Sequence, residues 1–182
     1  LFEKQAQELN PGFIKRMQSG LPFVRVKMAM SLDGRTAMAS AESQWITGEH
    51  ARHDVQKLRA QSCAIISAAG TVLADNAQLT VREPDLLQAL GKRRPLRVLL
   101  DQHTRVPADA KIFDNAAPTL WCTEQPVANN LPAHIEHWQS SSDLRALLKE
   151  LARRGCNEVL VEAGSTLAGL FLQEKLVDEL II

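Results

Sequence analysis

The chain has 182 residues and contains no tyrosine. Two large groups of oxidoreductases use a tyrosine hydroxyl as their proton donor: the short-chain dehydrogenases with a Tyr-x-x-x-Lys motif and the tyrosine-dependent aldo-keto reductases. The missing residue excludes both groups. If the protein is a redox enzyme, another side chain or a water molecule must supply the proton.

Cysteine is scarce as well. Cys63, Cys122 and Cys156 lie far apart and form no C-x-x-C pair, which excludes a zinc knuckle and a thioredoxin-type motif. We expect three reduced thiols in a reducing cytosol. His50 and His53 have helical spacing, but no third ligand follows at a suitable distance, so we expect a surface pair and no metal site.

The chain also lacks a charge surplus and a long apolar run. Lys plus Arg and Asp plus Glu both number 21, which argues against a nucleic-acid binder and against a polybasic membrane-surface protein. No apolar run approaches the ~18–20 residues of a membrane helix, and the charged start LFEKQAQELN is unlike a signal peptide. We therefore expect a cytoplasmic globular protein with neither nucleic acid nor membrane as a partner.

Segments with helical and strand patterns alternate along the chain, which predicts an α/β fold with a mainly parallel sheet flanked by helices. The expected strands are 23–30, 63–68, 96–101, 119–123, 135–138, 157–164 and 177–182, and the expected helices are 1–20, 47–61, 141–154 and 165–175. We expect residues 70–82 to be a loop with about one helical turn, and 83–95 to be a polar loop or insertion. Because the chain stops inside an apolar strand, we expect it to be a fragment.

The strongest local pattern is VLVEAGSTLAGLFL, residues 159–172. A buried strand delivers Glu162 at its carboxyl end, where α/β proteins place groups that contact ligands. Gly164 then precedes a helix that begins near Ser165. Such a helix N-terminus favours an anion, and the hydroxyls of Ser165 and Thr166 add donors. An ordinary glycine turn with serine as the helix cap is the alternative.

A second pattern consists of KMAMSLDGRTA and SQWIT, within residues 27–47. Lys27 lies inside an expected strand, where an inward ammonium needs a partner. Trp45 stands between the hydroxyls of Ser43 and Thr47, an arrangement that suits a heterocycle and its ribose. Trp45 as an ordinary core residue is equally open.

A third pattern runs from Arg59 to Arg82. Both guanidinium groups could hold a phosphate through paired hydrogen bonds. Thr71 and Asp75 lie between them in the expected loop. For each arginine, a place on the solvated surface is the alternative.

Four blocks of the sequence, in fixed order, closely resemble the reductase domain of the bacterial bifunctional riboflavin-biosynthesis protein. They are VKMAMSLDGRTAMASAESQWITGEHAR, LRAQ, GTVLADNAQLTVR and VEAGSTLAGLFLQEKLVDEL. The resemblance covers residues 22–182, while residues 1–21 resemble a linker or remnant of the upstream deaminase domain. It implies a fold like that of dihydrofolate reductase, usually in a homodimer. Relatives continue past VDEL, so we expect the reductase domain to be C-terminally incomplete.

The resemblance implies the activity of a 5-amino-6-(5-phosphoribosylamino)uracil reductase. This enzyme uses NADPH to convert the ribosyl side chain of a small phosphorylated substrate into the ribityl product. The partner deaminase requires a zinc site of the H-x-E and P-C-x-x-C type, which this chain lacks. We therefore expect the reductase step alone, and no deaminase activity, from this chain.

The family's binding residues can be transferred to matching positions of this sequence. The substrate positions are Ser43, Arg59, Leu79, Arg82 and Glu162. The NADPH positions are Ala29, Trp45, Thr71, Asp75, Gln102, Gly164, Ser165, Thr166, Leu167, Ala168, Gly169 and Leu170. Two positions depart from the family: Gln102 stands where relatives often have serine, and Ala41 replaces a glycine.

For the chemistry, Lys27, Asp75, Glu162 or a bound water could supply the proton, and we expect Lys27 and Asp75 to be the polar pair beside the reacting carbon. Arg59 and Arg82 would hold the 5′-phosphate of the substrate, and the turn at Gly164 the phosphates of NADPH. Two other functions remain open. One is a related reductase that acts on another heterocycle such as a pterin, and the other is a non-catalytic NADPH-binding fragment.

Overall fold

The computed structural model describes residues 5, 8–31, 33–36, 46–127, 130–139 and 143–182. Its centre is a seven-stranded sheet in the order β5-β4-β3-β2-β6-β1-β7, and each neighbouring pair is parallel. The strands are β1 (Phe23–Lys27), β2 (Ala64–Ala68), β3 (Leu96–Leu100), β4 (Thr119–Thr123), β5 (Ile135–Gln139), β6 (Glu158–Glu162) and β7 (Glu179–Ile181). The predicted fold class, α/β with a mainly parallel sheet flanked by helices, is confirmed.

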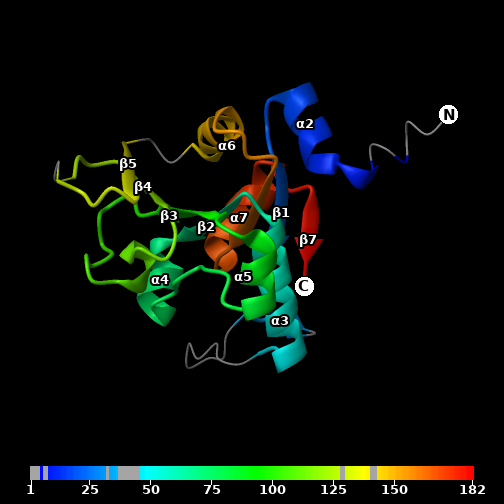
Figure 1. Cartoon of the computed structure of the whole chain (residues 1–182), viewed down its shortest axis with the longest axis horizontal. Helices are drawn as coiled ribbons and strands as arrows, with labels where there is room; N and C mark the ends of the chain where they lie inside the picture. Colours follow the sequence, from blue (N-terminus) through cyan, green and yellow to red (C-terminus); the bar gives the residue numbers. More distant parts are fainter. Residues whose placement is uncertain (1–4, 6–7, 32, 37–45, 128–129, 140–142) are drawn as a thin grey trace.

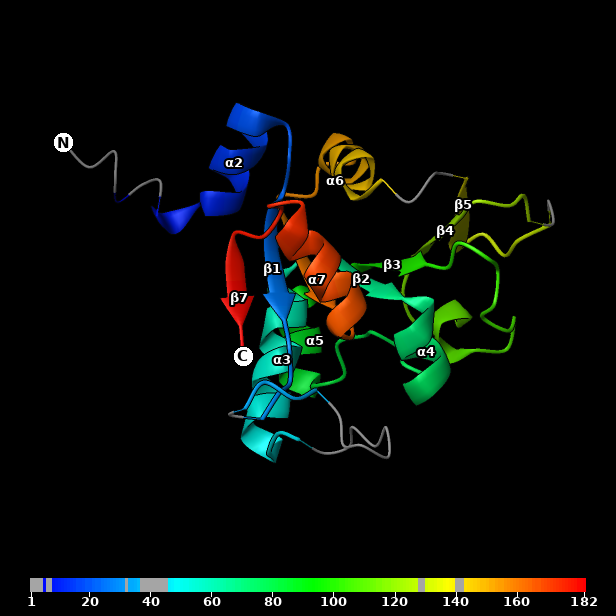
Figure 2. The same cartoon turned by 180° about the vertical axis from the view of Figure 1, so that it is seen from behind.

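Helices cover both faces of this sheet (Figures 1 and 2). They are α2 (Pro11–Ser19), α3 (Glu49–Gln61), α4 (Ala69–Asp75), α5 (Pro84–Leu90), the 3₁₀ helix η1 (Lys111–Phe113), α6 (Leu144–Arg153) and α7 (Ser165–Gln173). Helices α6 and α7 lie on one face, and α3, α4 and α5 lie on the other. In such a sheet the carboxyl ends of the strands form the edge where ligands usually bind.

Alternating side chains along the strands divide the core in two. One cluster joins the valines of β1 and β6 to α6 and α7, with Leu148 and Phe171 fully buried in it. The other joins β2 and β3 to α4 and η1, around Ile65 and Ile112. In β1 the buried positions alternate with half-buried ones, so Lys27 projects away from the α6–α7 cluster, toward the face that carries α3.

Two segments that we expected to be loops are helical. Helix α4 begins directly after β2, and the burial of Ala69 and Val72 holds it against the sheet. It is longer than the single helical turn that we expected there. Helix α5 occupies part of the expected polar loop. Pro84 presets the first turn of α5, Asp85 complements its positive end, and Gly91 ends it with a positive φ of 58°. The polar composition of the segment concealed these helix signals.

Candidate functional site

The carboxyl ends of β1 and β6 bring two predicted site residues side by side. Lys27 ends β1 and is in register with Glu162, which ends β6. Residues in register on neighbouring strands project to the same face of a sheet. The ammonium and the carboxylate therefore leave the sheet together, although the two residues lie far apart in the sequence.

A third predicted residue, Arg59 of α3, meets Glu162 in a two-pronged ion pair. Its Nε lies 2.6 Å from Oε1 and its Nη2 lies 2.8 Å from Oε2. Both side chains are only 11% exposed. Burial disfavours the charged guanidinium, but the charge and the hydrogen bonds of Glu162 outweigh it, so the pKa of Arg59 lies above its ordinary value. For Arg59, the alternative of a solvated surface residue is therefore wrong.

The segment after α4 approaches the same ion pair. The Thr80 carbonyl accepts a hydrogen bond from Arg59 Nη1 at 2.9 Å. Next to it, Leu79 has a left-handed φ of 54°, and its side chain is buried in the α4–η1 cluster. Arg82 has an exposed side chain, and its backbone N–H donates to Gln56 Oε1 at 2.8 Å. One region thus contains three of the predicted substrate positions, Arg59, Leu79 and Glu162. The Arg82 backbone is held next to this region by its hydrogen bond to Gln56 of α3.

The start of α7 follows directly from Glu162. Gly164 is the residue before the helix and no side chain caps it, so the expected alternative of serine as the cap is wrong. Ser165 and Thr166, in the first turn, are exposed. A Cβ added at Gly164 would meet no atom within 4 Å. The first turn of α7 is therefore open, with backbone N–H groups available to an anion.

A cavity of about 240 Å³ lies beside this turn, at the carboxyl ends of β2, β3 and β4. Its walls are mainly apolar, and its polar residues stand where strands end or helices begin. It is lined by Ala68, Ala69, Leu100, Gln102, His103, Arg105, Cys122, Trp138, Asp143, Leu144, Leu147, Thr166, Leu167 and Leu170. Four predicted cofactor positions therefore share one cavity: Gln102, Thr166, Leu167 and Leu170.

Several residues of this cavity were not among the sequence candidates. His103 and Arg105 follow β3, and both are exposed. Trp138 comes from β5. Burial raises the pKa of Cys122 to about 12, so that thiol is not a nucleophile at neutral pH. The signal that could have found His103 and Arg105 is their place just after a strand, where α/β proteins bind ligands.

The remaining candidates are more scattered. Ala29 is half-buried just after β1, while Ala168 is buried and Gly169 half-buried within α7. Thr71 lies half-buried in α4, and Asp75 is exposed at the end of α4. Sheet order places β6 between β1 and β2. Lys27 ends β1, whereas Asp75 ends the helix that follows β2, and β1 and β2 are about 10 Å apart at the usual strand spacing. Ser43, Trp45 and Ala41 lie outside the described residues.

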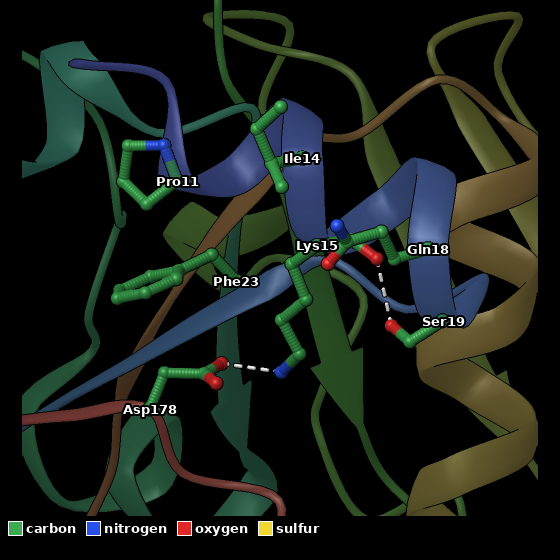
Figure 3. A pocket seen from close by; sticks show the side chains of 7 residues that line it. All are labelled: Pro11, Ile14, Lys15, Gln18, Ser19, Phe23 and Asp178. Atoms are coloured by element: carbon green, nitrogen blue, oxygen red, sulfur yellow. Dashed lines mark hydrogen bonds and ion pairs between the residues drawn. The ribbon is translucent and has the colours of Figure 1, made fainter. Parts of the chain in front are cut away.

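A second cavity, of about 300 Å³, lies between α2 and the start of β1 (Figure 3). Lys15 and Asp178 form an ion pair across it, and Asp178 Oδ2 also accepts from the Val24 N–H at 2.7 Å. Helix α2 is fixed to the domain again where Arg16 Nε donates to Asn157 Oδ1 at 2.6 Å. This cavity lies at the amino end of β1, the opposite end from Lys27, so it is separate from the candidate site.

Within the part of the chain that the structure describes, no group of three or more His, Cys, Asp or Glu residues could hold a metal ion. Within it, too, none of the helices combines the length and the apolar character needed to cross a membrane. All three cysteines are free thiols.

Comparisons with known proteins point to one family. A family model described as the RibD C-terminal domain matches residues 22–182. Two proteins named riboflavin biosynthesis protein RibD, from Haemophilus influenzae and Escherichia coli, are 45% and 44% identical over 100% of this chain. The matched region is 52% and 53% of their own length. The chain thus spans about half the length of these relatives.

Solved structures agree with this match. Acinetobacter baumannii RibD (form 2) is 43% identical with a TM-score of 0.87, covering 98% of this chain and 49% of that one. A Thermotoga maritima protein is 34% identical with a TM-score of 0.83, covering 94% of this chain and 47% of that one. Its description is a diaminohydroxyphosphoribosylaminopyrimidine deaminase/5-amino-6-(5-phosphoribosylamino)uracil reductase.

Proposed function

The chain belongs to the RibD C-terminal domain family, and from this we propose that it is a 5-amino-6-(5-phosphoribosylamino)uracil reductase. It would use NADPH to reduce the ribosyl side chain to the ribityl product in riboflavin biosynthesis. The activity named for the Thermotoga maritima relative supports this assignment. We further propose that the domain acts in the cytoplasm, as a homodimer, and behind a deaminase domain that residues 1–21 would join to it.

One observation supports the proposal: the β6–α7 turn links the Arg59–Glu162 ion pair to the cavity. Glu162 closes the ion pair with Arg59, and Gly164, just beyond it, opens the helix whose Thr166 lines the cavity. Two ligands bound on either side of this turn would have their reacting ends close together. Holding two reactants in this way is a major source of rate acceleration.

The cavity suits a phosphorylated dinucleotide. Its apolar walls can accept an adenine ring, and the uncapped first turn of α7 can accept a pyrophosphate. His103 and Arg105, which line the same cavity, are the groups that we propose for the 2′-phosphate, which NADPH has and NADH lacks. When bound, NADPH would supply the hydride for C1′ of the opened ribosyl side chain.

On the substrate side, Arg59 and Glu162 act as a unit. Glu162 holds the guanidinium of Arg59 and neutralises its charge, while Thr80 takes another of its N–H groups. Because Glu162 already pairs with Arg59, we propose that the exposed Arg82 carries more of the 5′-phosphate charge than Arg59 does. Ser43 and Leu79 complete the proposed substrate contacts, Leu79 through its backbone because its side chain is buried.

We propose Lys27 as the residue that supplies the proton during reduction, with Asp75 as the second polar group. Lys27 leaves the sheet beside Glu162, on the substrate side. Asp75 ends α4, whose first residue, Ala69, lines the cavity, and we assign Asp75 to the cofactor side. A Lys27→Met change should lower kcat by roughly two orders of magnitude, the usual contribution of general acid catalysis. An Asp75→Asn change that leaves kcat unaltered would remove Asp75 from the chemistry.

The test is turnover. The protein is mixed with freshly deaminated substrate, and the loss of reduced-nicotinamide absorbance is followed, with wild type and Arg82→Ala compared. Arg82→Ala should raise KM for the substrate because one phosphate contact is lost. A reductase of an unphosphorylated pterin would show no such change, and a non-catalytic fragment would bind NADPH in a fluorescence titration without oxidising it. Either result would overturn the proposed function.

A further inference from the structure

Strand β3 carries a buried charge that lies outside the residues assigned so far. The Arg97 side chain is 0% exposed, and a buried guanidinium is stable only when acceptors surround it. Its Nη1 lies 2.8 Å from Asp114 Oδ1. The same side chain also donates to Thr119 Oγ1 and to the carbonyl oxygens of Gln78, Lys111, Asp114 and Ala117. The segments that follow α4 and η1 are therefore both held by one buried group.

Asp114 links Arg97 to the side chain of Gln78 through hydrogen bonds to both. Burial alone would raise the pKa of the Asp114 carboxyl, but hydrogen bonds from Arg97, Gln78 and the Ala116 backbone outweigh burial and lower it. The carboxylate thus stays ionised at neutral pH and can only accept hydrogen bonds. The Gln78 amide must then direct its Nε2 to Asp114, at 2.5 Å, and its Oε1 accepts from Thr80 Oγ1 at 3.0 Å.

The Gln78 amide therefore joins Asp114 to Thr80 across a turn whose backbone conformation is rare for residues other than glycine. Leu79, between Gln78 and Thr80, has a φ of 54°, and its side chain anchors the turn because it is buried in the core cluster of α4 and η1. The turn directs the Thr80 carbonyl to Arg59 Nη1 at 2.9 Å. It also leads into Arg82, whose backbone is fixed on Gln56. The orientation of Arg59 thus depends on Glu162 from one side and on this turn from the other.

We propose that Gln78 is a positioning residue for substrate binding, acting through Thr80 on Arg59 and Arg82. The inference rests on the proposed function. Gln78 touches no reacting atom in this scheme. It fixes the distance between the two cationic groups, and a ligand that carries a sugar phosphate binds best to cations held at one separation, because fewer side chains must be ordered on binding.

The experiment compares steady-state kinetics of wild type, Gln78→Ala and the matched control Gln173→Ala, an exposed glutamine at the end of α7. Gln78→Ala leaves the Arg97–Asp114 pair intact. It should raise KM for the pyrimidine substrate about tenfold, while kcat and KM for NADPH stay within about twofold. Gln173→Ala should match wild type. A Thr80→Val variant, which removes the hydroxyl but keeps the carbonyl, should raise substrate KM in the same direction.

The second readout is whether the effects of the two substitutions on substrate KM combine. If Gln78 acts through Thr80, the double variant Gln78→Ala/Thr80→Val should raise substrate KM no more than Gln78→Ala alone. Independent, multiplying effects would overturn the inference, as would a Gln78→Ala variant with unchanged substrate KM or with both KM values raised equally. If the wild-type protein itself shows no turnover, the proposed function fails and this inference with it, which is distinguishable from failure of the variants alone.

Discussion

At Gly12, helix α2 packs closely against the segment that leads into β6. A Cβ built there would clash with Glu158 Cγ and would lie 2.7 Å from the Asn157 carbonyl oxygen. A side-chain end can move aside, but the backbone at the start of β6 cannot move without disturbing the sheet. The position therefore requires glycine because of space, with no need for a positive φ.

We predict that Gly12→Ala lowers the free energy of unfolding by about 1–3 kcal/mol, the usual cost of overpacking. Urea denaturation followed by circular dichroism measures this change. Gly70→Ala is the control, because a Cβ at Gly70 within α4 meets no atom within 4 Å. It should stabilise the protein by about 0.4–1 kcal/mol. Equal effects of the two substitutions would contradict the packing at Gly12.

At the scale of single residues, the sequence gives the type of each side chain, while the fold decides which side chains meet. The sequence singled out Arg59 and Glu162 as substrate residues through the family resemblance, but their mutual ion pair requires α3 to lie over the end of β6. Gln78 and Arg97 gave no signal at all. Arg97 stands in an ordinary strand pattern, and only the fold shows that acceptors from three later segments surround it.

Among the elements, α6 and β5 are joined by a charged cluster. Glu150 of α6 accepts hydrogen bonds from Arg153 and Arg154, and Arg154 reaches across to Glu136 of β5. The hydrogen bonds of Arg153 come first among the causes that lower the pKa of Glu150 to about 2, with burial opposing them. A carboxyl whose pKa is lower when folded than when unfolded stabilises the protein only while it is ionised.

We predict that this contribution is complete above the unfolded pKa of about 4.3. It should be lost as the pH falls from there through about 2, the folded pKa of Glu150. The melting temperature of a Glu150→Gln variant should therefore fall less than that of wild type as the pH is lowered through this range. At pH 7 the variant should be less stable than wild type. Thermal melts at a series of pH values measure both. Parallel curves for the two proteins would show that Glu150 does not titrate as described.

Element boundaries followed the sequence wherever apolar periodicity was strong, as in β2, β6 and α6. The two missed helices, α4 and α5, are each seven residues long. So short a helix offers too few turns for a periodic pattern to stand out. What fixes α4 is the burial of Ala69 and Val72, which depends on where the neighbouring strand lies and cannot be inferred from the segment alone.

For the molecule as a whole, binding of the cofactor should appear as added stability. A ligand at a hundredfold excess over its Kd adds about 2.7 kcal/mol to the free energy of unfolding. At about 2–4 °C per kcal/mol for a domain of this size, the melting temperature should rise by roughly 5–10 °C. We predict that NADPH produces this shift at a lower concentration than NADH, because His103 and Arg105 line the cavity.

Arg105→Ala should reduce the difference between the two cofactors by weakening NADPH alone. Thermal melts over a concentration series of each nucleotide provide the measurement. If Arg105→Ala weakens NADPH and NADH equally, the arginine contributes to the cavity without reading the 2′-phosphate. If neither nucleotide shifts the melt of the wild-type protein, the cofactor assignment itself is wrong.

The order of the strands governs how the protein must assemble during synthesis. Strand β1 leaves the ribosome before the other strands, yet its neighbours in the sheet are β6 and β7, the last two described. By contrast, β2, β3, β4 and β5 pair in sequence order and can form early. Pairing between distant segments is slow. The nascent chain therefore carries β1 without its sheet neighbours until β6 and β7 have been made, and exposed, unpaired strands of this kind are prone to aggregation.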